Sequence, residues 1–439
     1  MSVLDLVEHG TRRRIGKDRS VDGPFAGLRV IEFGQYIAVP YCAQLIADGG
    51  ADVIKIEPLE GDPSRRNGQV IPTEARQFLN KNRGKRSLAV DLDHAEALAA
   101  VKSLVEKADV LLTNFRPGQA ERFGLDYESV AARNPRVIYA ENTAFGRQGP
   151  MAGAPGMDIM LQAYAGLAVA TPAGPQPLTD PIVDYAAALL LAWGVSTALY
   201  HRERSGRGQK LDVALLQAAL VLQNNHINHI DAIDDWRGGF VDYLKTAFAE
   251  GKTWTEVLAH RAAIQPHAFA KAYYGFFPTR DGTIAIAAAG RVNQLRILRV
   301  LGLKDRWVEE PGWLPDDPAT HMERSYAQVV DVLRSQPTAH WVTVLTAAGV
   351  PAAPVRLREE LLDDEQVWAN QFLVRREHDL IGGLTTVAPP VKFSATPLTA
   401  GGASPPLGRD SRSILVEAGL DAETIERLIA DGTVGAGAL

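Results

Sequence analysis

The chain has 439 residues, of which 46% are hydrophobic and 22% are charged, and its formal net charge is −6. This length predicts two domains. The negative charge argues against a bulk nucleic-acid binder, so any anionic ligand would need a local basic cluster. The single cysteine, Cys42, excludes an internal disulfide framework and fits a reducing cytoplasm; we expect it to be a small buried residue of a helix.

Residues 1–25 are interpreted as a polar N-terminal extension, because they carry several arginines but lack the apolar segment of a secretory signal. Beyond them, strand and helix patterns alternate. Short apolar runs predict strands at Leu28–Phe33, Asp52–Glu57, Ser87–Leu92, Asp109–Thr113 and Val137–Glu141. Helices are predicted at Pro40–Ile46 and at Ala97–Val105, the latter starting with a capping box formed by Asp93 and Glu96.

This alternation predicts an α/β fold with a parallel sheet covered by helices on both faces. Ligands of such sheets lie at the carboxyl ends of the strands, which directs attention to the segments after Phe33, Glu57, Thr113 and Glu141.

The longest apolar run predicts a helix at Tyr185–His201 that is too short for a membrane span and is better explained as buried. A basic loop, Arg202–Lys210, and a helix, Val213–Gln223, are predicted next. Tyr273–Pro278 and Thr283–Ala288 then predict a β-hairpin. We therefore expect a large domain built from residues 26–227 and 346–439, with a smaller α+β domain at 228–345 inserted between them.

Two common ligand sites fit the sequence poorly. The turn Gly34–Val39 follows a strand, but it lacks the later glycines of a dinucleotide-binding motif. His226, His229 and Asp231 would approach one metal ion only on a helix, and even there Asp231 lies off the face of the histidines. We expect surface or dimer-facing histidines, no metal site and no permanently bound cofactor.

Two groups of charged residues have alternative interpretations. The basic residues either bind phosphate groups or form a solvated patch; they are Lys81, Arg83, Lys85, Arg86, Arg116 and Arg122. Asp184 directly precedes an alanine- and leucine-rich helix. It is either the N-cap of that helix or a carboxylate, kept ionised by the helix N-terminus, that attacks a thioester.

A series of sequence motifs along the chain helps to choose between these interpretations. They include GLRVIEFGQYIAVPYCAQLIADGGADVIKIE, NKNRGKRSLAVDL, ADVLLTNFRPGQAERFGLDY, NPRVIYAENTAFGRQGP, PIVDYAAALLLAWG and VAPPVKFSATP. In these motifs, from Gly27 to about Val434, the sequence resembles the class III CoA-transferases, a family that includes formyl-CoA and carnitine CoA-transferases. The α-methylacyl-CoA racemases share their fold.

The resemblance implies a Rossmann-like large domain, a smaller inserted domain and an interlocked, ring-shaped homodimer in the cytoplasm, without nucleic-acid or membrane partners. It implies that Asp184 is the nucleophile, which forms an acyl anhydride and then an aspartyl–CoA thioester before a carboxylic acid takes the coenzyme A (CoA). It also implies that CoA or acyl-CoA, as substrate, contacts Tyr36, Ile37, Ala38, Val90, Asp91, Leu92, Asn114, Phe115, Arg116, Arg122 and Met157.

Departures from the family pattern leave alternatives open. The racemases have a histidine in a Gly-His-Asp block where this chain reads Gly156-Met157-Asp158, and a thioether cannot exchange protons. Met157 therefore favours transfer, with a racemase-type isomerase as the alternative. A catalytically silent acyl-CoA-binding homologue is a third hypothesis, and the retained Asp184 argues against it. The match of Arg237-Gly238-Gly239 to the glycine-rich loop of several transferases is weak.

Overall fold

A computed structural model describes residues 23–171, 173–265 and 271–437. Most of the predicted N-terminal extension therefore lies outside the described residues. The chain divides into two compact units, the first formed by both ends of the chain up to Ile230 and from Gln371, and the second by Asp231–Asn370. The sequence expectation had the smaller domain end at residue 345, before the short helices that close the second unit.

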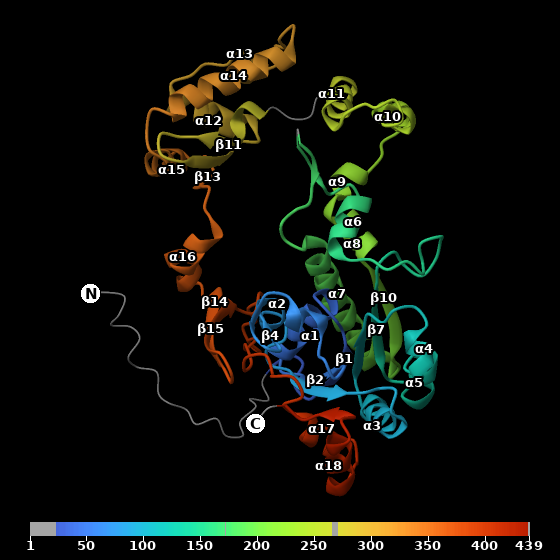
Figure 1. The fold of residues 1–439 in the computed structure, drawn as a ribbon. Coiled ribbons are helices and arrows are strands. Elements are labelled where there is room, and N and C mark those ends of the chain that lie inside the picture. The colour runs from blue at the N-terminus through green and yellow to red at the C-terminus, as the bar shows by residue number, and fades with distance from the viewer. Residues whose placement is uncertain (1–22, 172, 266–270, 438–439) are drawn as a thin grey trace, which may run out of the picture. The chain divides into compact units, whose positions relative to one another are not determined.

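The first unit is organised around a seven-stranded sheet of order β10-β7-β6-β1-β2-β5-β16 (Figure 1). Neighbouring strands are parallel except at β16, which pairs antiparallel with β5. The strands of this sheet are β1 (Arg29–Phe33), β2 (Asp52–Glu57), β5 (Arg86–Val90), β6 (Val110–Thr113), β7 (Ile138–Thr143), β10 (Gln209–Ala214) and β16 (Val434–Gly435). The five strands predicted from the apolar runs are all present, and the parallel sheet is confirmed.

Both faces of this sheet are covered because successive strand side chains point to opposite sides. On one face, residues such as Ile31 pack with α3 (Ala95–Glu106), α5 (Tyr127–Arg133), α17 (Ser411–Glu417) and α18 (Ala422–Ala430). On the other, residues such as Val30 pack with α1 (Ala38–Asp48) and α7 (Ile182–Ser205). Short apolar strands without polar alternation form because water reaches neither face.

The remaining elements of the first unit lie at its edges and loops. They are η2 (Pro63–Arg66), β3 (Gln69–Ile71), β4 (Glu74–Ala75), α2 (Arg76–Leu79), α4 (Gln119–Phe123), α6 (Asp158–Tyr164), β8 (Val169–Thr171), β9 (Gly174–Gln176), α8 (Leu215–Leu222), α9 (Asn224–Ile227), β14 (Leu373–His378) and β15 (Gly382–Val387).

Two local predictions differ from the structure. The predicted basic loop Arg202–Lys210 is a loop only at residues 206–208, because its first part is the end of α7 and its last part begins β10, an edge strand whose polar residues lack an apolar pattern. The capping box is absent, because His94 rather than Asp93 is the N-cap of α3 and no side chain caps that helix.

The second unit is an α+β structure around a three-stranded antiparallel sheet of order β11-β12-β13. The predicted hairpin is confirmed as β11 (Tyr274–Pro278) and β12 (Thr283–Ala287), and β13 (Ala352–Pro354) adds the third strand. Its core includes residues of α12 (Arg291–Leu301), α14 (Pro318–Leu333) and α15 (Thr338–Ala347). The other elements are α10 (Trp236–Ala247), α11 (Trp254–Ile264), η3 (Lys271–Tyr273), α13 (Arg306–Glu309), η4 (Arg358–Leu362) and α16 (Glu365–Ala369).

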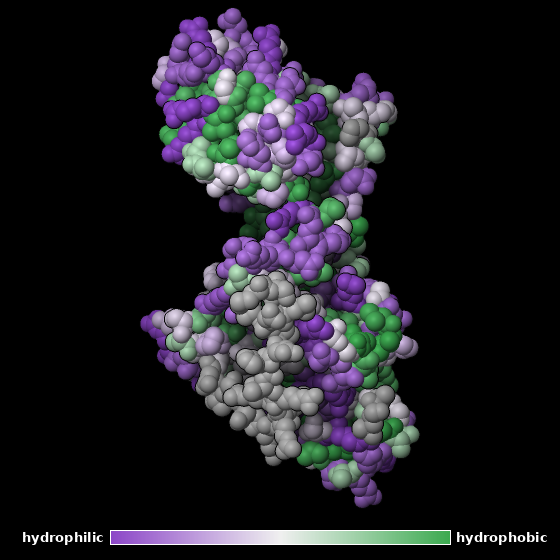
Figure 2. All heavy atoms as spheres, turned by 90° about the vertical axis from the view of Figure 1, so that its left-hand side faces the viewer, coloured by the Kyte–Doolittle hydropathy of each residue, from purple (hydrophilic) through white to green (hydrophobic). Residues whose placement is uncertain are grey.

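On the face shown in Figure 2, hydrophobic residues lie between hydrophilic ones. One helix, α7, is long and apolar enough to cross a membrane by length and composition. One side of it is a core element of the first unit, since Ala188, Leu191 and Val195 are buried against the sheet.

Candidate active site

Asp184 lies in the first turn of α7, but it does not cap the helix. The N-cap residue is Pro181, and the helix has no side-chain cap of its own. Instead Asp158, the first residue of α6, accepts hydrogen bonds from the backbone N–H groups of Val183 at 2.8 Å and Asp184 at 3.0 Å. The N-cap hypothesis for Asp184 is therefore wrong, because a carboxylate from another helix already occupies the backbone donors.

The side chain of Asp184 is consequently unpaired. Among the described residues, its carboxylate has no hydrogen-bond or salt-bridge partner, although the residue is partly buried. Burial, and after it the negative charge of Asp158, raise the pKa of this carboxyl to about 7, although the charge of Lys81 acts in the opposite direction. The helix start therefore does not lower the pKa of Asp184 as the sequence led us to expect.

A cavity of ≈ 340 Å³ lies at the carboxyl ends of β1, β2, β5 and β6. It lies at the sheet edge that the strand pattern indicates for ligands. It is lined by Phe33, Gly34, Gln35, Ile56, Glu57, Pro58, Leu59, Glu60, Asp62, Val90, Asp91, Leu92, Asp93, Phe115, Gln119 and Phe123. Four of these are among the residues predicted to contact CoA: Val90, Asp91, Leu92 and Phe115.

The other predicted contact residues lie in the loops after β1 and β6, at the start of α1, in α4 or at the start of α6. Asn114 and Gln35 connect the loop after β6 with the loop after β1. The Asn114 side chain accepts a hydrogen bond from the Gln35 N–H and donates one to the Gln35 carbonyl, each at 3.0 Å. Ile37 and Ala38 start α1, and Met157 is the exposed N-cap residue of α6.

Tyr36, also predicted to contact CoA, has a left-handed backbone with φ 64°. This conformation is rare for a residue with a large side chain and marks a constrained turn. Its backbone N–H group donates a hydrogen bond to the Asp62 carboxylate at 3.3 Å.

Of the basic residues considered as phosphate ligands, Arg116 and Arg122 are exposed. Arg122 forms an ion pair with Asp93, which lines the cavity, and its guanidinium lies 5.2 Å from the ring of Phe123. Arg116 has no carboxylate within salt-bridge distance in the described part of the chain. Both arginines are therefore exposed and adjacent in sequence to residues that line the cavity, Phe115 and Phe123.

The basic segment before β5 is neither a phosphate site nor a solvated patch. Arg83 pairs with Asp48 at 2.6 Å, Lys85 with Glu32 at 2.7 Å, and Arg86 with Asp52 at 2.6 Å and with Glu417 at 2.7 Å. Lys81 is also buried, with 1% of its surface exposed. The short spacing of these basic residues along the chain suggested one cluster, but in the fold Arg83, Lys85 and Arg86 pair with different carboxylates.

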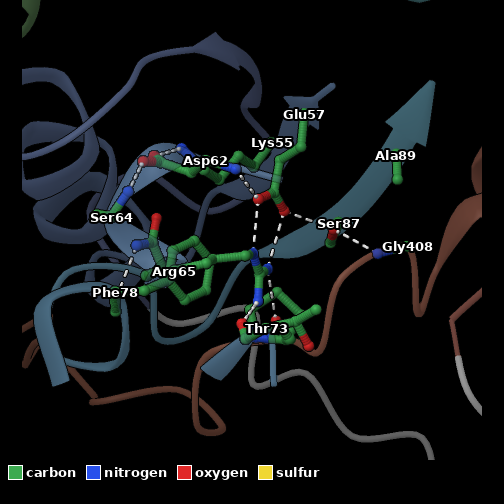
Figure 3. Close-up of polar contacts among 12 residues, drawn as sticks. Lys55, Glu57, Asp62, Ser64, Arg65, Thr73, Phe78, Ser87, Ala89 and Gly408 are labelled. Atoms are coloured by element: carbon green, nitrogen blue, oxygen red, sulfur yellow. Dashed lines mark hydrogen bonds and ion pairs between the residues drawn. The ribbon is translucent and has the colours of Figure 1, made fainter. Parts of the chain in front are cut away.

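A buried polar network includes two residues that line the cavity, Glu57 and Asp62 (Figure 3). Arg65 donates to both oxygens of Glu57, at 2.7 and 2.9 Å, and to Glu74 at 2.9 Å. Asp62 pairs with Lys55 at 3.0 Å and accepts from the backbone N–H of Ser64 at 2.8 Å. The sequence did not predict this network, because nothing in the segment Asp62–Arg66 indicates that its charged side chains are buried.

The remaining candidates do not form a reactive centre. Cys42 is fully buried in α1, and burial raises the pKa of its thiol far above neutral pH. His226 lies in α9, whereas His229 and Asp231 follow the end of that helix, so the helical spacing of the metal hypothesis is absent. No group of three or more potential metal ligands occurs within residues 23–171, 173–265 and 271–437.

Comparisons with known proteins identify the family of this chain. Residues 25–411 match the model of CoA-transferase family III. The chain is 32% identical to the succinate–glutarate CoA-transferase of Agrobacterium fabrum, over 92% of this chain and 97% of that protein. It is 31% identical to the acetyl-CoA:oxalate CoA-transferase of Acetobacter aceti, over 85% of this chain and 90% of that one.

A solved structure resembles the fold as well. The crystal structure of a CaiB/BaiF family protein from Brucella suis aligns with a TM-score of 0.71 and 28% identity, covering 90% of this chain and 100% of that chain. The chain belongs to CoA-transferase family III, and it is a CoA-transferase. The prediction of a CoA-transferase is therefore confirmed.

Proposed function

We propose that this member of CoA-transferase family III transfers CoA by double displacement with Asp184 as the nucleophile. The observation that carries the proposal is the unpaired carboxylate of Asp184 at a helix start whose donors are already taken. Carboxylates that lose water without gaining a partner are poorly stabilised, and such groups gather at functional sites. Its raised pKa fits a nucleophile that must alternate between a free carboxylate and an acyl derivative.

The proposed transfer consists of four nucleophilic attacks. The Asp184 carboxylate attacks the thioester carbonyl of the donor, which forms an anhydride and releases CoA thiolate. The thiolate attacks the Asp184 carbonyl, which releases the donor acid and leaves an aspartyl–CoA thioester. The acceptor carboxylate attacks this thioester to form a new anhydride, and the thiolate returns to the acceptor acyl group, which regenerates Asp184.

Each tetrahedral intermediate of this sequence needs hydrogen-bond donors for its oxyanion. The N–H groups of Val183 and Asp184 are already donated to Asp158, so the proposal requires other donors.

We propose that CoA binds at the cavity at the carboxyl ends of the strands, with its phosphate groups outside, at Arg116 and Arg122. The lining supports this orientation, since Glu60 and Asp91 are acidic and would repel phosphates inside. Arginine suits phosphate because its planar fork donates two parallel hydrogen bonds. The other proposed contacts are Tyr36, Ile37, Ala38, Val90, Asp91, Leu92, Asn114, Phe115 and Met157.

We further propose that the enzyme is a cytoplasmic homodimer. Large apolar side chains of α7 are exposed, including Trp193 at 69%, Tyr200 at 65% and Leu189 at 52%. Exposed apolar surface of this size is typical of a subunit interface. The interlocked ring form is an expectation from the family, and sedimentation of the purified chain tests the stoichiometry.

Trapping the intermediates tests the mechanism. Purified enzyme is mixed with acyl-CoA donors and labelled acids; succinate, glutarate and oxalate are the first panel, because they occur in the names of the relatives. We expect a covalent adduct that hydroxylamine removes and borohydride reduces, mapped by mass spectrometry to Asp184. Asp184→Ala should lower exchange by roughly 1000-fold or more, because the covalent route is lost.

A neighbouring acid provides the matched control. Asp180 is exposed and precedes α7, so Asp180→Asn should leave both the adduct and the exchange rate nearly unchanged. Full exchange by Asp184→Ala, or an adduct on another residue, would overturn the proposal.

A further inference from the structure

An ion pair connects two of the segments that line the cavity at the carboxyl ends of the strands. Val90–Asp93, at and after the end of β5, form one part of the lining, and Gln119 and Phe123 of α4 belong to another. Asp93 pairs with Arg122 of α4, and the Arg122 guanidinium lies 5.2 Å from the centre of the Phe123 ring. A carboxylate and a ring of the lining therefore hold this guanidinium beside the cavity.

The pair is exposed and joins side chains that have few other contacts. The Asp93 carboxylate pairs with Arg122, while the backbone N–H group of Asp93 donates to the Asp91 carboxylate at 2.9 Å. Within residues 23–171, 173–265 and 271–437, Arg122 pairs with no other carboxylate. The side chains of Arg122 and Asp93 are 64% and 58% exposed. Because water solvates both groups, such a pair adds little to stability and opens readily when another anion reaches the arginine.

Two other arginines of this unit show what distinguishes Arg122. Arg65 is fully buried between Glu57 and Glu74, so it cannot exchange its partners for a ligand. Arg116 is exposed and has no carboxylate within salt-bridge distance in the described part of the chain. Arg122 is exposed like Arg116, yet it already has an anionic partner. A phosphate group that binds at Arg122 must therefore share or replace Asp93.

A carboxylate and a phosphate group use the same donors of a guanidinium group, because both accept the parallel hydrogen bonds of its planar fork. A phosphate group that approaches Arg122 also approaches the negative charge of Asp93, which repels it. Asp93 therefore weakens anion binding at Arg122 in two ways: it occupies the guanidinium, and it offsets the positive charge.

We propose that Asp93 sets the affinity of the enzyme for CoA by competing with a phosphate group of CoA for Arg122. In the free enzyme Asp93 holds the guanidinium, and on binding the phosphate group takes its place. The inference rests on the proposed binding of CoA phosphates at Arg116 and Arg122. Asp93 is in this view a determinant of affinity, and it takes no part in the covalent steps at Asp184.

This competition acts equally on every CoA ester. The donor and the product carry the same phosphate groups, so a weaker phosphate contact lowers the affinity for both. The donor then binds less tightly, and the product leaves more readily. Asp93→Asn should accordingly lower the KM for the donor without raising kcat, which is the signature of uniform binding.

Calorimetric titration of the purified full-length protein with CoA at low ionic strength tests the competition directly. Asp93→Asn keeps the size of the side chain and removes its charge, so the Kd for CoA should fall about threefold. Arg122→Met should raise the Kd about tenfold, because a charge-assisted contact is lost. In the Arg122→Met background, Asp93→Asn should change nothing, because the competitor acts only through Arg122.

A matched variant controls for general charge effects. Glu121 is exposed, lies next to Arg122 in α4 and does not pair with it. Glu121→Gln removes the same charge as Asp93→Asn, and it should change the Kd by less than about 1.5-fold, since exposed charges without contact are screened. Circular dichroism of each variant verifies that the protein is folded.

An unchanged Kd in Asp93→Asn would overturn the inference. So would tighter binding that persists in the Arg122→Met background, or an equal gain in Glu121→Gln, because each indicates repulsion without competition. Failure of the proposed phosphate site gives a different result. If Arg122→Met weakens CoA binding while Asp93→Asn has no effect, the phosphate site stands and only the competition is wrong. If Arg122→Met leaves the Kd unchanged, both are wrong.

Discussion

Replacing Asp184 by asparagine should stabilise the folded protein at alkaline pH while it abolishes transfer. The folded-state pKa of about 7 lies above the ordinary value of 3.8. The folded state therefore holds its proton more tightly than the unfolded chain does. Stability from this group is present below about pH 4 and is lost as the pH rises through 7. Above pH 7, an ionised Asp184 costs up to about 4 kcal/mol of the free energy of unfolding.

The same linkage gives the dependence on pH. The cost of the wild-type carboxyl is about 2 kcal/mol at pH 5 and about 4 kcal/mol at pH 8. Asparagine has no such cost, and it breaks no hydrogen bond of the carboxylate, because that carboxylate has no partner among the described residues. We therefore expect the advantage of Asp184→Asn over wild type to grow by about 2 kcal/mol between pH 5 and pH 8.

Urea unfolding followed by circular dichroism at the two pH values measures this advantage. Glu203→Gln is the matched control: it removes an exposed carboxylate from the same helix and should change stability by less than about 0.5 kcal/mol at either pH. An advantage that is equal at pH 5 and pH 8, or a variant less stable than wild type at pH 8, would refute the assigned burial and charge of Asp184.

Two further variants test the supports of the site. Asp158→Ala leaves two buried backbone N–H groups at the start of α7 unpaired and should lower the free energy of unfolding by about 1–3 kcal/mol, measured by urea unfolding; unchanged stability would contradict its capping role. Arg65→Met leaves Glu57 and Glu74 buried without their cation and should cost about 3–5 kcal/mol. The exposed Arg427→Met is its control, with an expected cost below about 1 kcal/mol in the same assay.

Local patterns along the sequence predict the framework of the fold well. The strands β1, β2, β5, β6 and β7 are short apolar runs because both faces of the sheet are covered, and this makes them recognisable. The edge strand β10 was missed for the converse reason, since its side chains are partly exposed and polar. The sequence thus identifies buried strands through their composition, and it does not identify strands held mainly by backbone pairing.

The charges of the site could not be assigned in this way. Arg83 and Lys85 are two residues apart, yet one pairs with Asp48 and the other with Glu32. The cap of α7 comes from Asp158, 26 residues before Asp184. Partners so distant along the chain leave no local pattern, so the sequence indicated which residues are charged and not what each charge contacts.

This distinction bears most directly on Asp184. At a helix start, the favourable interaction of a carboxylate with unpaired N–H groups normally lowers its pKa. Here Asp158 takes those N–H groups and adds its own negative charge, so the same position has the opposite effect on Asp184. The capping interaction that stabilises α7 is therefore separated from the carboxylate proposed to react. Asp158 anchors the helix, while Asp184 stays unpaired among the described residues and partly buried.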